Sequence, residues 1–225
     1  MRFYLTVPFN EKEEAKALGC LWDPHQKQWY LSAENPEIIA RWPIERSELP
    51  AEFSGENRAF GGNELYVDLV PQSCWFTNVR TCIAKNDWNR LRRYIYNRAN
   101  YLCECCGEKA PLEAHERWDF NEGTKIQKLV RVIALCKLCH EVTHMGLAQI
   151  RGRGEIAFRH LMKVTKMNEL EAQLHIDEAF SLWEKRSQFH WLLDISLITN
   201  AGIKLTREFN LKERAIISQI QFIYE

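Results

Sequence analysis

The sequence has no net formal charge and no hydrophobic run long enough to span a membrane. Its 30 Lys and Arg residues balance 30 Asp and Glu residues. The most apolar late stretch, residues 191–198, is short and contains Asp194, so we expect no transmembrane helix. The first residues lack the basic start and apolar core of a secretion signal, which favours a soluble, cytoplasmic protein. A hydrophobic content of 46% excludes extensive disorder.

The charges balance over the whole chain but are unevenly distributed along it. Residues 1–79 have a net formal charge of −5 and residues 167–225 one of −3, whereas residues 80–166 have +8. A basic block is expected of a protein that binds phosphates, and it predicts a nucleic-acid partner. We expect this partner to be DNA. The alternative is a solvated surface that is basic by coincidence.

Residues 1–43 are expected to form a small β-α-β domain. A strand at residues 3–7 ends before Pro8, Asn10 is a suitable N-cap for a helix that Gly19 ends, and residues 29–31 form a second strand. Two patterns resemble a small domain appended to plasmid primases, namely Gly19-Cys-Leu-Trp22-Asp-Pro24 and Lys27-Gln-Trp29-Tyr-Leu. The resemblance implies a nucleic-acid setting but no chemistry. The alternative is a packing accessory with both tryptophans in its core.

A linker and a basic helix are predicted to follow. Residues 44–62 are polar, with one proline and three glycines, and residues 65–70 alternate like a strand. Residues 87–100 have helical periodicity, and Leu91 and Ile95 mark a side that faces a core. The other side carries four candidate contacts to nucleic acid, Arg90, Arg92, Arg93 and Arg98. We expect one face of this helix to pack and the other to touch phosphate.

The C-terminal part is expected to be helical. Residues 156–166 and 169–186 have helical periodicity, and these helices could close the core or mediate dimerisation. The tail, residues 201–225, is either a packed terminal element or a partner surface. Its apolar residues are Ile216, Ile217, Ile220 and Phe222.

Four of the eight cysteines form two pairs with the spacing of a metal site. The pairs are Cys103-x-x-Cys106 and Cys136-x-x-Cys139. In a reducing compartment this spacing indicates metal rather than disulfides, and four thiolates suit tetrahedral structural zinc. The alternative is four buried or incidental cysteines. The others match no such spacing, so we interpret Cys105 as a spare thiol and Cys20, Cys74 and Cys82 as core residues.

Three histidines are predicted to converge beside the cysteine pairs. His115 lies in an expected strand, residues 112–116, and a second strand covers residues 129–135. His140 and His144 are four residues apart and would project from one face of a helix. Three imidazoles could hold a divalent ion (Mg²⁺, Mn²⁺, Ni²⁺ or Zn²⁺) and leave positions open for water and phosphate, which metal-assisted phosphodiester hydrolysis requires. The alternative is surface or core histidines, or one that joins the zinc site.

Residues 100–147 resemble the HNH, or ββα-metal, endonuclease family. The resemblance rests on Cys-x-x-Cys-Gly, Leu-Glu-Ala-His-Glu and Leu-Cys-x-x-Cys-His-x-x-x-His. The flanking motifs Val67-Asp-Leu-Val-Pro71, Cys74-Trp-Phe-Thr-Asn-Val-Arg80 and Trp183-x-x-Arg186 are similar to a phage and bacterial subgroup. The family implies cleavage of nucleic acid, with His115, His140 and His144 as metal ligands.

The sequence departs from that family at two positions. The residue after the first ligand is normally the histidine that acts as general base, and here it is Glu116. Glu116 could act as the base, serve as a fourth metal ligand, or form a salt bridge with Arg117 or a lysine. The family's middle asparagine aligns near Arg131, and Asn121 in the intervening loop is a possible replacement.

The sequence therefore predicts an α+β protein built around a zinc-stabilised ββα-metal core. Its expected parts are a β-α-β domain (1–43), a linker (44–62), a strand and basic helix (63–100), the core (101–147), a helical part (148–200) and a tail (201–225). The leading hypothesis is a metal-dependent endonuclease in which Glu116 and His115 are catalytic. The alternatives are a weakened member that binds nucleic acid or a partner without cleavage, and a purely structural zinc scaffold.

Overall fold

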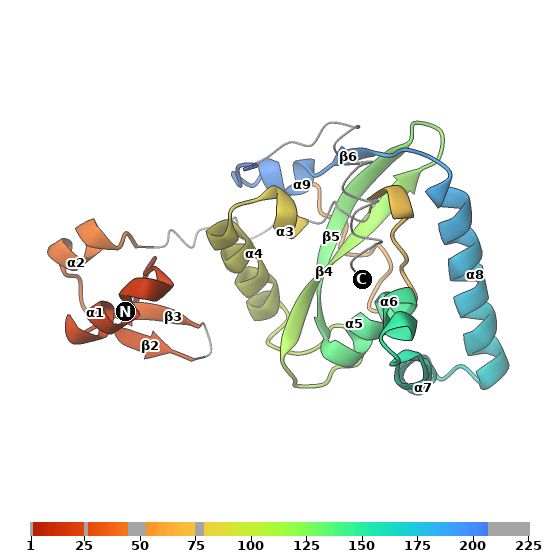
Figure 1. Ribbon diagram of the computed structural model, residues 1–225, viewed down its shortest axis with the longest axis horizontal. Helices are drawn as coiled ribbons and strands as arrows, with labels where there is room; N and C mark the ends of the chain where they lie inside the picture. Colours follow the sequence, from red (N-terminus) through yellow and green to blue (C-terminus); the bar gives the residue numbers. More distant parts are fainter. Residues whose placement is uncertain (1, 25–26, 45–52, 75–78, 207–225) are drawn as a thin grey trace. The chain divides into compact units, whose positions relative to one another are not determined.

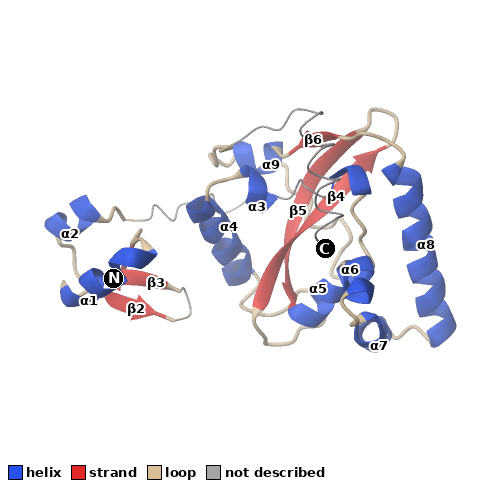
Figure 2. Ribbon diagram, viewed as in Figure 1, coloured by secondary structure: helices blue, strands red, loops and turns tan. Residues whose placement is uncertain are grey.

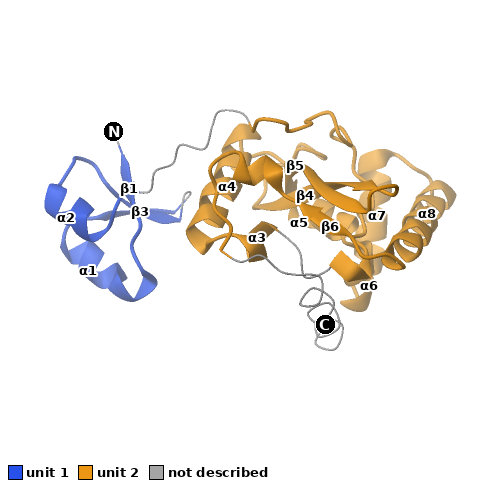
Figure 3. Ribbon diagram, turned by 90° about the horizontal axis from the view of Figure 1, so that it is seen from above, with its two compact units in different colours: residues 1–48 blue, residues 49–225 orange. Residues whose placement is uncertain are grey.

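The chain divides into two compact units, residues 1–48 and residues 49–225 (Figure 3). The computed structural model describes residues 2–24, 27–44, 53–74 and 79–206. Within these ranges the fold is α+β, with two three-stranded sheets and helices around them (Figure 2). No helix in these ranges combines the length and the apolar character needed to cross a bilayer.

Unit 1 contains three more elements than the predicted β-α-β arrangement. Its elements are β1 (Phe3–Leu5), the 3-10 helix η1 (Phe9–Glu11), α1 (Lys12–Ala17), β2 (Leu21–Asp23), β3 (Gln28–Leu31) and α2 (Pro36–Arg41). The strands form an antiparallel sheet in the order β1-β3-β2. β2 and α2 have three and six residues, too few to produce a recognisable period in the sequence.

The ends of the short helices confirm one predicted boundary and correct one predicted cap. Gly19 follows α1 with φ +85°, a left-handed conformation that suits glycine, so the predicted helix end is confirmed. Asn10 lies inside η1 and does not cap α1, which has Glu11 at its N-cap. Asn35 is the capping asparagine of this unit, because its side chain accepts hydrogen bonds from the backbone N–H groups of Glu37 and Ile38 at the start of α2.

The predicted linker and the predicted strand after it are both wrong in part. Phe53 is buried in the core of unit 2, and the backbone N–H of Asn57 donates to the carbonyl of Val130, so residues 53–62 pack rather than link. Residues 65–70 form no strand. Their N–H groups bond to helical partners instead, Val67 to His175 Nε2 and Asp68 to the carbonyl of Thr143, which leaves no ladder to a neighbouring strand.

A long hairpin divides unit 2 into two cores (Figure 1). It consists of β4 (Leu112–Asn121) and β5 (Ile126–Cys136), and β6 (Leu192–Asp194) runs parallel to β5. Successive side chains of a strand point to opposite faces, so Val132 and Ala134 enter one core while Ile133 and Leu135 enter the other. Both strands extend beyond the residues expected from the sequence, and a bulge between Arg117 and Trp118 shifts their register.

Helices cover both faces of this hairpin. One face packs against η2 (Gln72–Cys74), α3 (Val79–Cys82), α4 (Lys85–Arg98) and α9 (Ser196–Thr199). The other packs against α5 (Lys137–Thr143), α6 (Met145–Ile150), α7 (Gly154–Thr165) and α8 (Glu169–Ser187). The predicted helices 87–100, 156–166 and 169–186 are therefore confirmed as α4, α7 and α8.

The start of the predicted tail is part of the fold. Ile203 is buried, and Leu205 pairs with Ile83 in an isolated antiparallel bridge. The residues that suggested a partner surface, Ile216, Ile217, Ile220 and Phe222, lie outside the described residues.

Candidate functional site: two metal centres and a cleft

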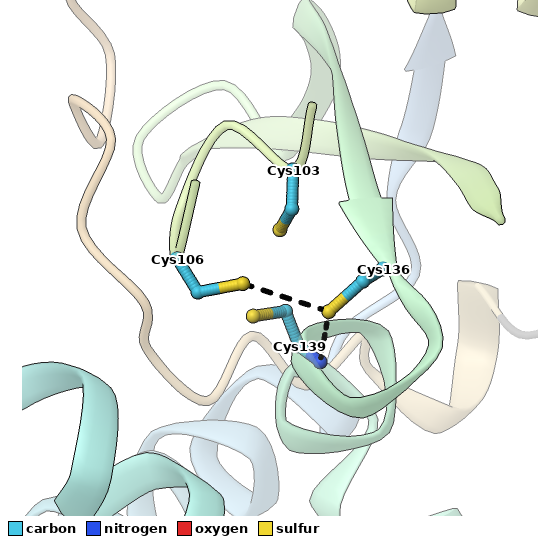
Figure 4. Close-up of side chains that lie close together, drawn as sticks. All are labelled: Cys103, Cys106, Cys136 and Cys139. Atoms are coloured by element: carbon cyan, nitrogen blue, oxygen red, sulfur yellow. Dashed lines mark hydrogen bonds between the residues drawn. The ribbon is translucent and has the colours of Figure 1, made fainter. Parts of the chain in front are cut away.

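The four predicted cysteine ligands meet at one point beside α5. Cys103 and Cys106 lie in the loop between α4 and β4, whereas Cys136 ends β5 and Cys139 lies in α5. The Cys136 sulfur also accepts a hydrogen bond from the backbone N–H of Cys139, at 3.5 Å, and so caps that helix. Figure 4 shows the four side chains directed toward a common centre.

The cysteine geometry fits a tetrahedral zinc ion. All four sulfur atoms lie within 4.8 Å of one another, and those of Cys106 and Cys136 are 3.7 Å apart. A zinc–sulfur distance of about 2.3 Å implies sulfur atoms about 3.8 Å apart at the corners of a regular tetrahedron. These four residues could therefore hold a metal ion as the spacing predicts.

The thiols of this cluster differ in their pKa. The Cys139 thiol and three backbone N–H groups donate to Cys103 and lower its pKa to about 4, in spite of burial. Desolvation is the main cause that raises the pKa of Cys106 to about 11. A cation at the centre would favour the thiolate at every position, since metal ligands bind deprotonated.

The remaining cysteines lie outside this cluster. Cys20, Cys74 and Cys82 are buried, as expected for core residues. The Cys105 thiol donates to the carbonyl of Glu64, with 3.5 Å between sulfur and oxygen, and desolvation raises its pKa to about 12. Cys105 is therefore a protonated thiol beside the cluster and not one of its members.

A histidine outside the predicted ligands lies next to the cysteine cluster. His160 on α7 is 7% exposed, and its Nε2 lies 3.1 Å from the sulfur of Cys139. This histidine follows Cys139 by 21 residues in another helix, so no local motif could have linked the two. An N–H donated to a zinc-bound thiolate is a common outer-shell contact.

The three predicted histidines also meet. His115 lies in β4, His140 in α5, and His144 between α5 and α6. The ring centroids of His140 and His144 are 4.6 Å apart, and those of His115 lie 5.4 and 4.9 Å from them. One nitrogen from each ring lies within 4.8 Å of the others, so these residues also could hold a metal ion.

His115 is buried without hydrogen-bond partners, as is expected of a side chain that binds a metal ion. It is 2% exposed, and neither ring nitrogen has a hydrogen-bond partner among the described residues. Buried polar atoms are normally satisfied, so an unpartnered, buried imidazole fits a side chain that binds a metal ion. Burial also holds the pKa of His115 well below its ordinary value, which keeps the ring in the neutral form that binds metal.

Two carboxylates approach the histidine cluster from outside. Glu113 Oε2 lies 2.6 Å from Nδ1 of His140, which leaves Nε2 of that ring for a metal. Asp68 Oδ2 lies 3.8 Å from Nε2 of His115, and burial raises the pKa of Asp68. Neither was a predicted site residue. Glu113 could have been found, because it lies two residues from His115 on the same face of β4.

Glu116 lies beside the histidines but not among their ligand atoms. It points to the face of β4 opposite His115, and its Oε1 accepts a hydrogen bond from the backbone N–H of Val79 at 2.9 Å. Desolvation raises its pKa. The alternative of a salt bridge with Arg117 is wrong, because that guanidinium lies on the other face and donates to the carbonyl of Glu64.

Arg131 and Asn121 hold the fold rather than a ligand. Arg131 is 1% exposed, and it donates to the carbonyls of Phe60 and Gly62 and to Glu104. The Asn121 side chain accepts from two N–H groups of the β4–β5 turn. Asn121 lies six residues from His115, about 20 Å along an extended strand, so it cannot replace a group at the histidine cluster.

A cleft of about 820 Å³ opens between α4 and β4 and ends at the histidines. Glu116, His140 and His144 line it, together with three cationic residues, Arg80, Lys85 and Arg92. The cleft therefore joins two carboxylates, Glu113 and Glu116, with two imidazoles and a basic wall in one cavity. Arg80 and Lys85 were missed because they precede the helical period used to choose candidates.

The four predicted arginines of α4 have different roles. Arg92 lines the cleft. Arg98 does not, because its guanidinium is 11% exposed and donates to both oxygens of Glu56 and to the carbonyl of Val132. Arg90 forms an ion pair with Asp87 at 2.9 Å, and Arg93 is half-buried. Arg98 is therefore a structural residue, and its expected contact with nucleic acid is wrong.

Similarity to known proteins is found for a small part of the chain. Residues 2–43 match a family described as a domain of unknown function, DUF5710. Two proteins of Escherichia coli, each named DNA primase TraC, are both 43% identical to this chain, one over 56 residues and the other over 42. The matches cover 24% and 18% of this chain, but only 5% and 3% of those proteins. No solved structure matches the chain.

These matches confirm the relation of the N-terminal residues to a domain that is found on primases. The family match lies within unit 1.

Proposed function

We propose that unit 2 is a metal-dependent, HNH-like endonuclease that hydrolyses phosphodiester bonds of DNA. The observation that carries this proposal is the unpartnered, buried His115 beside His140 and His144 at the end of a basic cleft. In that cleft the chain offers groups for each role that hydrolysis needs, namely ligands, a carboxylate base and cations for phosphate. The β4–β5–α5 arrangement also agrees with the resemblance of residues 100–147 to that family.

The three imidazoles are the residues that would hold the divalent ion. When bound, the ion would polarise a phosphate oxygen and lower the pKa of a water molecule. The chain orients His140 through the carboxylate of Glu113, at 2.6 Å. Arg80, Lys85 and Arg92 would pair with phosphates next to the one that is cut.

Glu116 is the residue that we assign as general base. The Val79 N–H holds its Oε1, which directs the carboxylate and leaves Oε2 to accept a proton. Desolvation raises its pKa, and a carboxylate with a raised pKa is a stronger base. Its side chain lines the cleft, as do those of His140 and His144.

Unit 1 would bring the enzyme to its substrate. Two relatives of this segment are named DNA primases, which supports a DNA-processing setting for this chain. On this basis we assign unit 1 a recruiting role and no chemistry.

A second function, binding without cleavage, is favoured by one observation. The hydrogen bond from Val79 could hold Glu116 as a structural residue that stabilises the start of α3. The basic cleft would then bind nucleic acid without turnover.

The test is metal-dependent cleavage of supercoiled plasmid. Protein that retains its zinc is incubated with Mg²⁺, Mn²⁺ or Ni²⁺, beside Glu116→Gln and His140→Ala. Glu122→Gln, at an exposed carboxylate in the hairpin turn, is the matched control. We expect nicking by the wild type and the control and a loss of at least about 100-fold in both site variants. A wild type that shifts DNA in a gel but cuts with none of the metals would contradict the nuclease.

A further inference from the structure

The large cleft is bordered by two of the three clustered histidines, His140 and His144. A second cavity of about 160 Å³ opens against α5 and α6. The two cavities share Glu113, His140 and His144 in their linings. The His140 and His144 side of the candidate metal site therefore borders two cavities.

The second cavity is also basic. Lys137, in the first turn of α5, and Arg151, at the end of α6, line it and are exposed. Within the part of the chain that the structure describes, neither has a carboxylate at ion-pair distance. The carboxylates in this cavity are otherwise engaged, since Glu141 holds Arg153 at 2.7 and 2.8 Å and Glu113 contacts His140.

Cations thus stand on both sides of the histidines, with Arg80, Lys85 and Arg92 in the large cleft and Lys137 and Arg151 in the small one. A phosphate monoester or the end of a strand needs cations on one side only. A strand that continues through the site needs them on both sides, because it carries a phosphate at every nucleotide.

We propose that Lys137 and Arg151 hold the DNA strand beyond the phosphate that is cut. The substrate is then an internal stretch of strand that crosses from one cavity to the other. The aromatic residues Trp88 and Tyr96 line the large cleft alone, so base stacking belongs to that side and backbone contact to the other. This inference rests on the proposed function, because it takes the histidine cluster as the point of cleavage.

The first experiment measures binding and requires no cleavage. Lys137→Glu/Arg151→Glu is compared with Lys109→Glu/Lys163→Glu, which makes the same change of charge at exposed positions outside both cavities. Fluorescence anisotropy with a 30-nucleotide single strand is recorded over a range of salt, without added divalent ions. Zinc content reports that each variant is folded.

We expect the first variant to bind at least tenfold more weakly than the control. The slope of log affinity against log salt should fall by about 1.4, since each lost phosphate contact on a single strand contributes about 0.7. Equal affinity and equal slope in the two variants would overturn the proposal.

The second experiment separates this surface from the proposed activity. Circular single-stranded DNA, which has no ends, is the substrate, with Mg²⁺, Mn²⁺ or Ni²⁺. Cleavage of the circle supports a strand that crosses the site, whereas cleavage of linear strands alone would overturn it. If the variant binds weakly and the wild type cuts nothing, the surface stands and the nuclease falls. If the wild type cuts the circle and the variant binds normally, the surface falls and the nuclease stands.

Discussion

The cysteine and histidine clusters share one short helix but differ in what surrounds them. Cys139 and His140 are consecutive residues of α5, so the two candidate metal centres are adjacent along the chain. Four thiolates complete a tetrahedron and leave no position for a substrate, whereas three imidazoles leave at least one. The cysteine cluster lies in the core between the hairpin and helices α5 to α8, while His140 and His144 line two cavities. The cysteine centre is therefore the one that would stabilise α5, and the histidine centre is the one that a substrate could reach.

The largest effect is expected from Cys136→Ser/Cys139→Ser. Structural zinc in small domains contributes about 10 kcal/mol or more to folding, which equals the whole stability of an ordinary domain at about 5–15 kcal/mol. We expect unit 2 to lose its cooperative thermal transition, and the histidine centre to be lost with it, because α5 carries both. Circular dichroism melting and metal analysis measure this.

Cys105→Ser is the matched control for that variant, because Cys105 lies outside the tetrahedron. It should keep its zinc and its melting transition. A double variant at Cys136 and Cys139 that melts like the wild type would remove the structural role of the cysteine centre.

The double variant His140→Ala/His144→Ala should remove the histidine centre and keep the cysteine centre. Neither ring packs in the enclosed core around the cysteines, so the fold should survive with its zinc intact. We expect the wild type to bind one equivalent of added Mn²⁺ or Ni²⁺ by titration calorimetry and the variant to bind none. Loss of zinc from this variant would show that the comparison is wrong and that the two centres are one folding unit.

The sequence predicted both clusters because most of their members lie close together along the chain. Two Cys-x-x-Cys pairs and two histidines four residues apart fix their own geometry on a turn or a helix, and the hairpin supplies His115. The partners of these ligands come from far along the chain. Asp68 and His160 reach the two centres through tertiary contacts, for which no local periodicity exists.

The same limit explains the errors outside the clusters. Arg98 matches a solvent-facing position of a helix, but Glu56, in a segment with the composition of a linker, binds it. Residues 65–70 alternate like a strand, yet their N–H groups bond to His175 and Thr143. In each case a long-range partner overrides a pattern that is locally correct.

A smaller effect is expected from Glu113→Gln. Glu113 contacts Nδ1 of His140, and removal of such an outer-shell carboxylate typically weakens metal binding about 10- to 100-fold. Titration calorimetry with Mn²⁺ should show this loss, with zinc content and the melting transition unchanged. Glu108→Gln is the control, since Glu108 is an exposed carboxylate that lines neither cavity. Equal affinity in both variants would mean that His140 orients without Glu113.

The smallest effect is expected at His160, a side-chain partner of the cysteine centre. Nε2 of His160 lies 3.1 Å from the Cys139 sulfur, and because a zinc-bound thiolate can only accept, an N–H from His160 would form a hydrogen bond to a charged group, worth about 1.5 kcal/mol or more, or about tenfold in affinity. His160→Leu, which fills similar space without a donor, should release zinc to a chromogenic chelator about tenfold faster. His160→Gln retains an N–H donor and should restore most of the difference. If both variants release zinc at the same rate, His160 stabilises the centre by packing, and the cysteine cluster depends on its enclosure alone.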